Sequence, residues 1–289
     1  MRNSVAKVVR LSALVGAGGA LSFAVFFSNC GGSEGPRTGA AGTSGGVAGT
    51  SGAAGATGTA GVTGAGGRFT CPSDSTLNCP SAITLTGGHV TNFSPEEWSP
   101  TDGKYCNASG LRGSVFSYSG PTVDGGNISS NSHGVDAAAG NFRLTLMAGS
   151  AGYAGGGVSF DRCVTAAAST GIKYTVSMAD GGDQMNCTFK LQLQTFEQRP
   201  TTQSPPGACD STAGSCYGFP ASPSVTLTTT PQTITVPWAN FTTGATHTNP
   251  FMGQIVGLQW QLESGAPLED GGAQTACSVE VRIDDIDFI

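Results

Sequence analysis

Apolar and polar residues alternate in short runs along much of the chain beyond residue 110, and a period of two is typical of half-buried β-strands. Helix-period patterns of useful length are hard to find there. Gly, Pro, Asn and Ser bound the runs, as they do at turns between strands. The pattern predicts strands at 114–118, 142–147, 157–160, 172–178, 188–195, 224–228, 232–236, 254–262 and 277–288. Eight or nine such strands predict an all-β fold of two sheets packed face to face.

The fifth and eighth predicted strands have especially clear faces, because each carries large apolar residues at every second position. Gln192 and Gln194 lie on the polar side of the first, and Gln259 and Gln261 on the polar side of the second. If the two strands share a sheet, these glutamines form a surface rich in paired donors and acceptors. We interpret this surface as a platform for sugar hydroxyls. The alternative is an ordinary solvated sheet face.

The chain ends in a run of apolar and charged residues, 281–289, that predicts a strand closing a sheet. The apolar residues before and after the Asp284-Asp285 step have opposite parity. A β-bulge at this step returns the apolar side chains to one face, so the sequence predicts a bulge there. A bulge can also aim a carboxylate at Ca²⁺, and we take Asp285 as a candidate metal ligand.

Residues 1–30 have the pattern of an export signal, with three basic residues ahead of an uncharged, mostly apolar stretch at 11–27. The sequence Phe27-Ser28-Asn29-Cys30-Gly31 then resembles the lipobox of bacterial lipoproteins. This resemblance implies a lipid anchor on Cys30, and Gly31 in place of aspartate implies the outer membrane or cell surface. Plain secretion and an uncleaved anchor are the alternatives, and all three export the rest of the chain.

Residues 31–68 consist almost entirely of Gly, Ala, Thr and Ser. Such a stretch has too little large apolar side chain to offset the entropy of ordering. We therefore expect a disordered, flexible tether with a mean reach of ~35 Å. The remaining residues, 69–289, are of a size that suits one large all-β domain.

Eight cysteines follow Cys30, an even number that favours four disulfides in an exported protein. They are Cys71, Cys79, Cys106, Cys163, Cys187, Cys209, Cys216 and Cys277. The pairing is open, although Cys71 with Cys79, and Cys209 with Cys216, are close enough in the chain to close single loops. Thiolate metal binding is the weaker alternative, because no Cys-x-x-Cys occurs and the histidines are scattered.

Residues 69–289 carry 8 basic and 18 acidic residues, a net charge of −10. Charge of this sign repels nucleic acid and anionic polymers. We therefore expect no nucleic-acid partner, while neutral ligands and ligands bound through a metal remain open.

Four passages carry a family resemblance through their order and spacing. They are VTNFS at 90–94 with GSVFSY at 113–118, GYAGGGVSF at 152–160 with STGIKY at 169–174, SCYG at 215–218 with QTITVPW at 232–238, and GLQW at 257–260 with IDDI at 283–286. The chain from about 88 to 289 resembles the carbohydrate-binding modules of the galactose-binding jelly-roll superfamily, near the family 11 type. The resemblance implies a jelly roll, often with a structural Ca²⁺, and frequently glycan binding.

The chain departs from this pattern at the first strand. Where such modules often have Asp-Phe-Glu, this sequence has Asn92-Phe93-Ser94, which removes two candidate metal ligands. Glu97, Asp102 and Asp285 remain as oxygen donors. We take Asp102 and Asp285 as the candidate ligands of a structural Ca²⁺.

A binding module needs exposed aromatic rings that stack on sugars. Trp98, Tyr105, Tyr118 and Tyr153 lie in or beside predicted loops. We take Trp98 and Tyr105, together with the four glutamines, as the candidate ligand-binding residues. Trp260 lies on an apolar stripe and is expected in the core.

An enzyme needs a nucleophile with a base, or two carboxylates in a cleft. No Gly-x-Ser-x-Gly motif lies on a strand-to-helix turn, and Asp136 near His133 is the single carboxylate close to a histidine in sequence. Adjacent Glu96 and Glu97 are expected to point in different directions. The sequence therefore predicts a non-catalytic, cell-surface carbohydrate-binding module. A structural or interaction lipoprotein without a glycan ligand is the alternative, and a glycan-active enzyme is less favoured.

Overall fold

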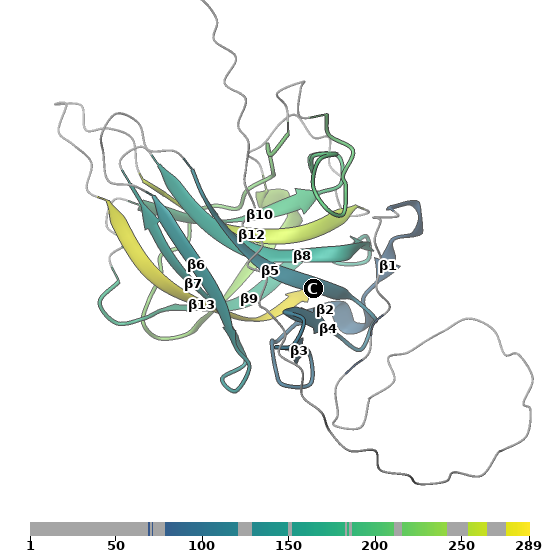
Figure 1. The fold of residues 1–289 in the computed structure, drawn as a ribbon, viewed down its shortest axis with the longest axis horizontal. Helices are drawn as coiled ribbons and strands as arrows, with labels where there is room; N and C mark the ends of the chain where they lie inside the picture. The colour runs from purple at the N-terminus through teal and green to yellow at the C-terminus, as the bar shows by residue number, and fades with distance from the viewer. Residues whose placement is uncertain are drawn as a thin grey trace, which may run out of the picture. The chain divides into compact units, whose positions relative to one another are not determined.

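Two β-sheets pack face to face in the computed structural model of the chain (Figure 1), which confirms the all-β prediction. The structure describes residues 69, 71, 79–120, 129–149, 152–182, 184, 187–210, 216–241, 254–264 and 276–289. The predicted export signal and tether, residues 1–68, lie outside the described part of the chain. None of the helices described is long and apolar enough to cross a membrane.

Sheet A contains seven strands in the order β10-β12-β8-β5-β4-β3, with β1 paired to β8. Their bounds are β1 (Ile83–Thr84), β3 (Trp98–Ser99), β4 (Lys104–Cys106), β5 (Arg112–Ser119), β8 (Tyr153–Thr165), β10 (Cys187–Thr195) and β12 (Ile255–Ser264). The short β1–β8 pair is parallel, and the other pairs of this sheet are antiparallel.

Sheet B contains six strands in the order β11-β9-β13-β7-β6, with β2 paired to β13. Their bounds are β2 (His89–Thr91), β6 (Ser130–Asp136), β7 (Asn141–Ala148), β9 (Gly171–Met178), β11 (Gln232–Pro237) and β13 (Cys277–Phe288). Short 3-10 turns occupy η1 (Cys79–Ser81), η2 (Thr86–Gly88) and η4 (Trp238–Asn240). From β7 to β13, consecutive strands alternate between the sheets, so the sandwich has the jelly-roll connectivity that was predicted.

The predicted strands correspond to observed ones with one exception. Residues 224–228 form no strand; the Val225 N–H bonds to the Phe189 carbonyl (2.7 Å), so the segment only lies along the edge of β10. Pro220 and Pro223 lack the N–H groups that a regular ladder needs. Strand β6 was missed, because its sequence SNSHGVD is polar and pairs only with β7 at the edge of sheet B.

The core lies between the sheets and contains Trp260, as predicted. Trp260 of β12 is 0% exposed and meets Tyr174 of β9 edge to face, with ring centroids 5.5 Å apart. Such a pair contributes ~0.5–1.5 kcal/mol beyond the area that it buries. Because Trp260 points inward, its neighbours Gln259 and Gln261 point to the outer face of sheet A.

Strand β13 contains the predicted bulge. Its register with β9 shifts between Asp284 and Asp287, and Asp285 has φ +47. The left-handed residue lets Ile283 and Ile286, both buried, face the same core across the irregularity.

Four disulfides connect the cysteines of the folded part, as the even count predicted. They are Cys71–Cys106, Cys79–Cys163, Cys187–Cys277 and Cys209–Cys216. The short-range pairing of Cys209 with Cys216 is confirmed, whereas that of Cys71 with Cys79 is wrong, because each of these cysteines reaches a different strand of sheet A. The Cys187–Cys277 bond joins β10 to β13 across 90 residues, and closing a loop of that length stabilises the fold by about 4–5 kcal/mol in the chain-entropy view.

Candidate functional site

The four predicted glutamines lie together on the outer face of sheet A. Strands β10 and β12 pair so that Gln192 is opposite Gln259, and Gln261 follows one row further along β12. The two strands therefore share a sheet, which was the condition for a common glutamine face. Gln194 and Gln259 are each 7% exposed, so the surface is more closely packed than an ordinary solvated face.

We call Gln192, Gln194, Gln259 and Gln261 the amide row, and three of the four bond to one another in a directed chain. Gln194 Nε2 donates to Gln259 Oε1 (2.6 Å), and Gln259 Nε2 donates to Gln192 Oε1. Each bond fixes which end of an amide is the donor and which is the acceptor. The row therefore presents oriented donors and acceptors.

The second half of the row is fixed by groups from β5 and β12. Tyr118 Oη donates to Gln261 Oε1 (2.8 Å), and Gln261 Nε2 donates to Glu263 Oε1 (2.6 Å). Burial raises the pKa of Tyr118 well above its ordinary value, which keeps its hydroxyl a donor. Lys190 Nζ pairs with the other oxygen of Glu263 at 2.8 Å, so this end of the face has no unbalanced charge.

Two glycines of β8 form a floor beside the amide row. Gly157 lies opposite Gln259, and Gly155 lies opposite Gln261. A Cβ on Gly155 would lie 2.5 Å from Cζ of Tyr118, so the tyrosine ring crosses the strand where a side chain would otherwise stand. At Gly155 the missing side chain leaves the room that the ring of Tyr118 occupies.

Phe116 and Tyr118 of β5 lie beside the glycines, and Tyr153 lies at the start of β8; we call these three residues the aromatic row. Phe116 and Tyr118 are stacked with ring centroids 6.1 Å apart, and Tyr118 and Tyr153 are tilted at 6.2 Å. Tyr153 is 38% exposed. Phe116 was not predicted as a site residue, although its position two residues before Tyr118 in the same strand puts both rings on one face.

Two predicted ligand residues belong to the core instead. Tyr105 is 0% exposed, and its ring meets Phe93 edge to face at 6.4 Å. Trp98 is 8% exposed and lies opposite Tyr105 in the β3–β4 pair. Their place beside loops suggested exposure, but these loops fold the short strands onto the sandwich. The prediction that Trp98 and Tyr105 stack on a sugar is therefore corrected.

The predicted calcium ligands Asp102 and Asp285 gain no support as a pair. Burial acts to raise the pKa of Asp102, but hydrogen bonds with Ser99 and with Arg112 Nη2 (3.1 Å) together lower it below its ordinary value. Asp285 is exposed at the bulge of β13. Within the described residues, no group of three or more His, Cys, Asp or Glu side chains could hold a metal ion.

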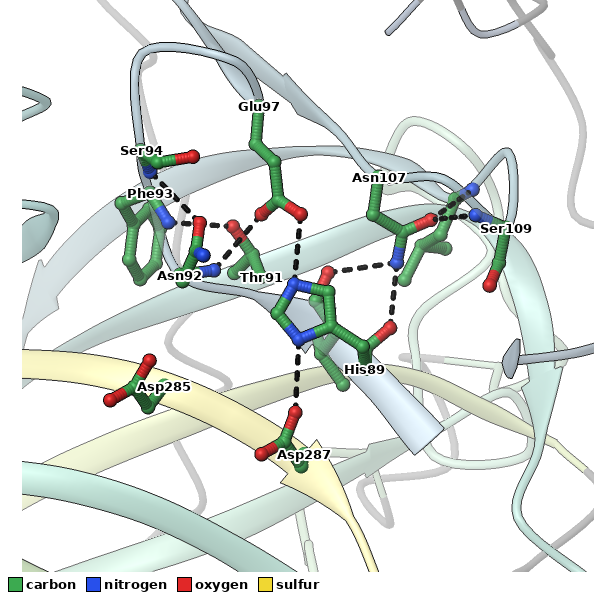
Figure 2. A network of polar contacts seen from close by, with 12 residues as sticks. His89, Thr91, Asn92, Phe93, Ser94, Glu97, Asn107, Ser109, Asp285 and Asp287 are labelled. Atoms are coloured by element: carbon green, nitrogen blue, oxygen red, sulfur yellow. Dashed lines mark hydrogen bonds and ion pairs between the residues drawn. The ribbon is translucent and has the colours of Figure 1, made fainter. Parts of the chain in front are cut away.

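The third oxygen donor considered for calcium, Glu97, is bound to a cation of the protein itself (Figure 2). His89 Nε2 donates to Glu97 Oε1 (2.8 Å), and His89 Nδ1 donates to Asp287 Oδ1 (2.9 Å). The bonds to Asp287 and Glu97 raise the pKa of His89 to about 10 against the opposing effect of burial, so the ring is an imidazolium at neutral pH. We call these three residues the imidazolium bridge.

The second oxygen of each carboxylate in the bridge also has a partner. The Asn92 N–H donates to Glu97 Oε2 (2.9 Å), and Lys173 Nζ pairs with Asp287 Oδ2 (3.0 Å). Figure 2 shows Asp285 beside these contacts without a dashed line to the bridge. The residues present do not fit a calcium ion here, because built-in cations already neutralise the carboxylates. The calcium prediction is otherwise untested.

The histidine nearest to a carboxylate in sequence makes a different contact. His133 Nδ1 lies 2.7 Å from Ser117 Oγ, and burial lowers the pKa of His133. Asp136, the expected partner, instead accepts the N–H of Ala139 (3.1 Å). This arrangement does not provide the serine, histidine and carboxylate relay of a hydrolase.

Comparisons with known proteins find similar solved structures at low sequence identity. No protein-family model and no curated protein sequence matches the chain. A family 11 carbohydrate-binding module of a cellulosomal cellulase from Clostridium thermocellum aligns with a TM-score of 0.38 and 15% identity, over 61% of this chain and 86% of that chain. A family 11 module from that organism, in complex with a β-1,3-1,4-mixed-linked tetrasaccharide, aligns with a TM-score of 0.37 and 13% identity, over 61% and 88%. A surface glycan-binding protein from Prevotella bryantii aligns with a TM-score of 0.28 and 15% identity, over 42% and 35%.

Proposed function

We propose that the outer face of sheet A binds a neutral polysaccharide, and that the domain is a non-catalytic carbohydrate-binding module. The observation that supports this most is that the aromatic row and the amide row adjoin on one face, where the ring of Tyr118 lies over Gly155 and its hydroxyl donates to Gln261. A sugar ring has an apolar C–H face, which packs on aromatic rings. Its hydroxyls donate and accept at once, as planar amides do.

The charges that border the two rows favour a neutral ligand. At one end Glu263 pairs with Lys190 at 2.8 Å. At the other end Asp161 pairs with Lys104 at 3.3 Å and with Arg112 at 3.9 Å. Because the acidic groups already have basic partners, neither end offers an unpaired charge to an ionic ligand.

The binding test uses a panel of mixed-linked β-1,3-1,4-glucan, xylan and galactomannan with the exported chain. Affinity electrophoresis identifies the polymer, and titration calorimetry measures the dissociation constant. Tyr153→Ala is expected to weaken binding about 2- to 12-fold, the effect of losing ~0.5–1.5 kcal/mol of ring contact. Thr145→Ala, an exposed change on sheet B, is the matched control and leaves binding unchanged.

Two outcomes would reject the proposal. If no polymer of a broad panel binds, the domain has a structural or interaction role. If reducing ends are released from a bound polymer, the domain is a glycan-active enzyme. Binding without release supports the module.

We further propose display at the cell surface through a lipid on Cys30, a residue outside the described part of the chain. The disulfides fit an oxidising compartment. Labelled palmitate should enter the full-length protein and not Cys30→Ser, which should appear in the medium. Labelling of both proteins would show that Cys30 is not the acylated residue.

A further inference from the structure

Beyond β10, a segment from 216 to 225 extends sheet A by irregular pairing. Gln192 and Ala221 form an antiparallel bridge. The Ser222 N–H bonds to the Leu191 carbonyl (2.8 Å), and the Leu193 N–H bonds to the Pro220 carbonyl (2.9 Å). Directly opposed residues of an antiparallel pair point to the same face. Ala221 therefore belongs to the outer face, beside the amide row.

Two aromatic residues precede Ala221 at two-residue intervals, Phe219 and Tyr217. Their rings meet edge to face with centroids 6.1 Å apart. Phe219 is 5% exposed, whereas Tyr217 is 54% exposed, more than any other large apolar side chain in the described ranges. The buried ring of Phe219 thus packs against the ring of Tyr217, which is exposed to solvent.

The backbone around Tyr217 is held in place at a cost. Tyr217 has φ +71, a conformation that a bulky residue rarely adopts. Its N–H bonds to the Gln198 carbonyl (3.2 Å), and the Cys209–Cys216 disulfide ends at the preceding residue. Such strain is most often found at functional sites, where the surroundings enforce it.

A buried arginine holds the loop against which Tyr217 lies. Arg199 is 5% exposed and donates to the carbonyls of Ser204 (3.1 Å) and Pro205 (2.8 Å). It directly follows Gln198, whose carbonyl accepts the N–H of Tyr217. Burial lowers the pKa of Arg199, while the charge of Asp161 on β8 acts in the opposite direction.

We propose that Tyr217 is an outlying stacking position of the same binding face, so that the ligand is an extended glycan chain and not a terminal sugar. This inference rests on the proposed function. Tyr153 lies in the row of Thr188. With Ala221 opposite Gln192 in an antiparallel pair, Phe219 comes level with Gln194, and the Tyr217 N–H reaches the Gln198 carbonyl beyond it. Gln194 is six residues from Thr188 along β10, roughly 20 Å at the usual rise of a strand. A chain that contacts both tyrosines must cover that length of the face.

The test compares a long and a short form of the polymer that binds in the panel above: the polymer itself and its smallest binding fragment. Tyr217→Ala in the exported chain should weaken polymer binding about 2- to 12-fold and leave fragment binding unchanged. Tyr217→Phe retains the ring and should bind both forms like the wild type. Tyr153→Ala, in contrast, should weaken both.

A second variant tests the position of Tyr217 without removing its side chain. Cys209→Ser/Cys216→Ser keeps the tyrosine but releases its brace, and should lose part of the polymer affinity while fragment binding is unchanged. Because a loop of this length contributes ~2–3 kcal/mol in the chain-entropy view, binding is measured well below the unfolding midpoint of the variant. Polymer binding by Tyr217→Ala at wild-type affinity would overturn the inference and leave the proposed function standing. A wild type that binds no glycan at all would overturn both.

Discussion

The outer faces of the two sheets follow the same alternation but expose different chemistry. On sheet B, Arg143 and Arg282 lie opposite each other and share Glu280 at 3.2 and 3.6 Å. Their side chains are 48% and 50% exposed. Ion pairs in such positions contribute ~0–1 kcal/mol. On sheet A, the corresponding outward positions hold partly buried amides and rings that fix one another.

The difference teaches that outward polarity alone does not make a binding face. The charged side chains of sheet B are exposed to water and can change partners. The amides and rings of sheet A are neutral, and hydrogen bonds hold them in one arrangement. Preorganised groups bind with a smaller loss of conformational entropy. The glycine floor of β8 is what allows that arrangement, because it leaves room for the ring of Tyr118.

The largest effect is expected from filling this floor. In Gly155→Ala, the new Cβ would lie 2.5 Å from Cζ of Tyr118 and 2.6 Å from the Trp260 carbonyl oxygen. We expect a loss of ~1–3 kcal/mol of stability and at least about a 10-fold loss of glycan affinity, measured by thermal unfolding and calorimetry.

Gly134→Ala on sheet B is the matched control, because a Cβ there meets nothing within 4 Å. Gly134→Ala should change neither the stability nor the glycan affinity. Wild-type glycan affinity in Gly155→Ala would mean that the glycine floor is not part of the binding surface.

A medium effect is expected at the imidazolium bridge, where charge holds β2 and the turn at Glu97 to β13. The pKa of His89 is raised from 6.5 to about 10, so its contribution to stability is complete below pH 6.5 and is lost as the pH rises towards 10. His89→Ala should cost ~1–3 kcal/mol at pH 6, less than a fully buried pair because the ring is 33% exposed. Unfolding in urea at pH 6 and pH 10 measures the cost of the substitution and its loss at alkaline pH.

The same pH series distinguishes the outer face of sheet A from the imidazolium bridge. Glycan affinity should stay constant from pH 6 to pH 9, since amides do not titrate and the pKa of Tyr118 lies far above that range. His89→Gln should lose the alkaline dependence of stability that the wild type shows. An unchanged dependence in that variant would assign it to another group.

The smallest effect is expected at Asp284, beside the bulge. Burial, the largest cause, raises the pKa of Asp284 from 3.8 to about 6. The folded state therefore holds this proton more tightly, and stability falls as the pH rises from 3.8 to 6. Asp284→Asn should raise the unfolding midpoint slightly at pH 7.5 and not at pH 3, by calorimetry. A lower midpoint at pH 7.5 would show that the ionised carboxylate stabilises the fold.

The fold was largely predictable because a period of two is enforced wherever one face of a strand is buried. Trp260 and the bulge at Asp285 follow from that parity alone. Strand β6 was missed since an edge strand does not need apolar residues.

The glutamines of the candidate site were predictable for the same reason, and of the four aromatic residues noted beside loops Tyr118 and Tyr153 lie in it. Whether Trp98 and Tyr105 are exposed depends on how short strands fold back, which is a tertiary property. Phe116 joined the site only through the register of β5 with β8, and His89 met Asp287 across 198 positions of sequence. Spacing in sequence does not report such long-range contacts.

The disulfide between Cys71 and Cys106 has a mechanical consequence. A pull on the chain ahead of Cys71 passes through this covalent bond to the end of β4 and bypasses the residues between, which include the imidazolium bridge to β13. The load then enters sheet A, the sheet whose outer face would carry the ligand. Tension between an anchor and a held polymer would thus run through one sheet, while sheet B bears none of it directly.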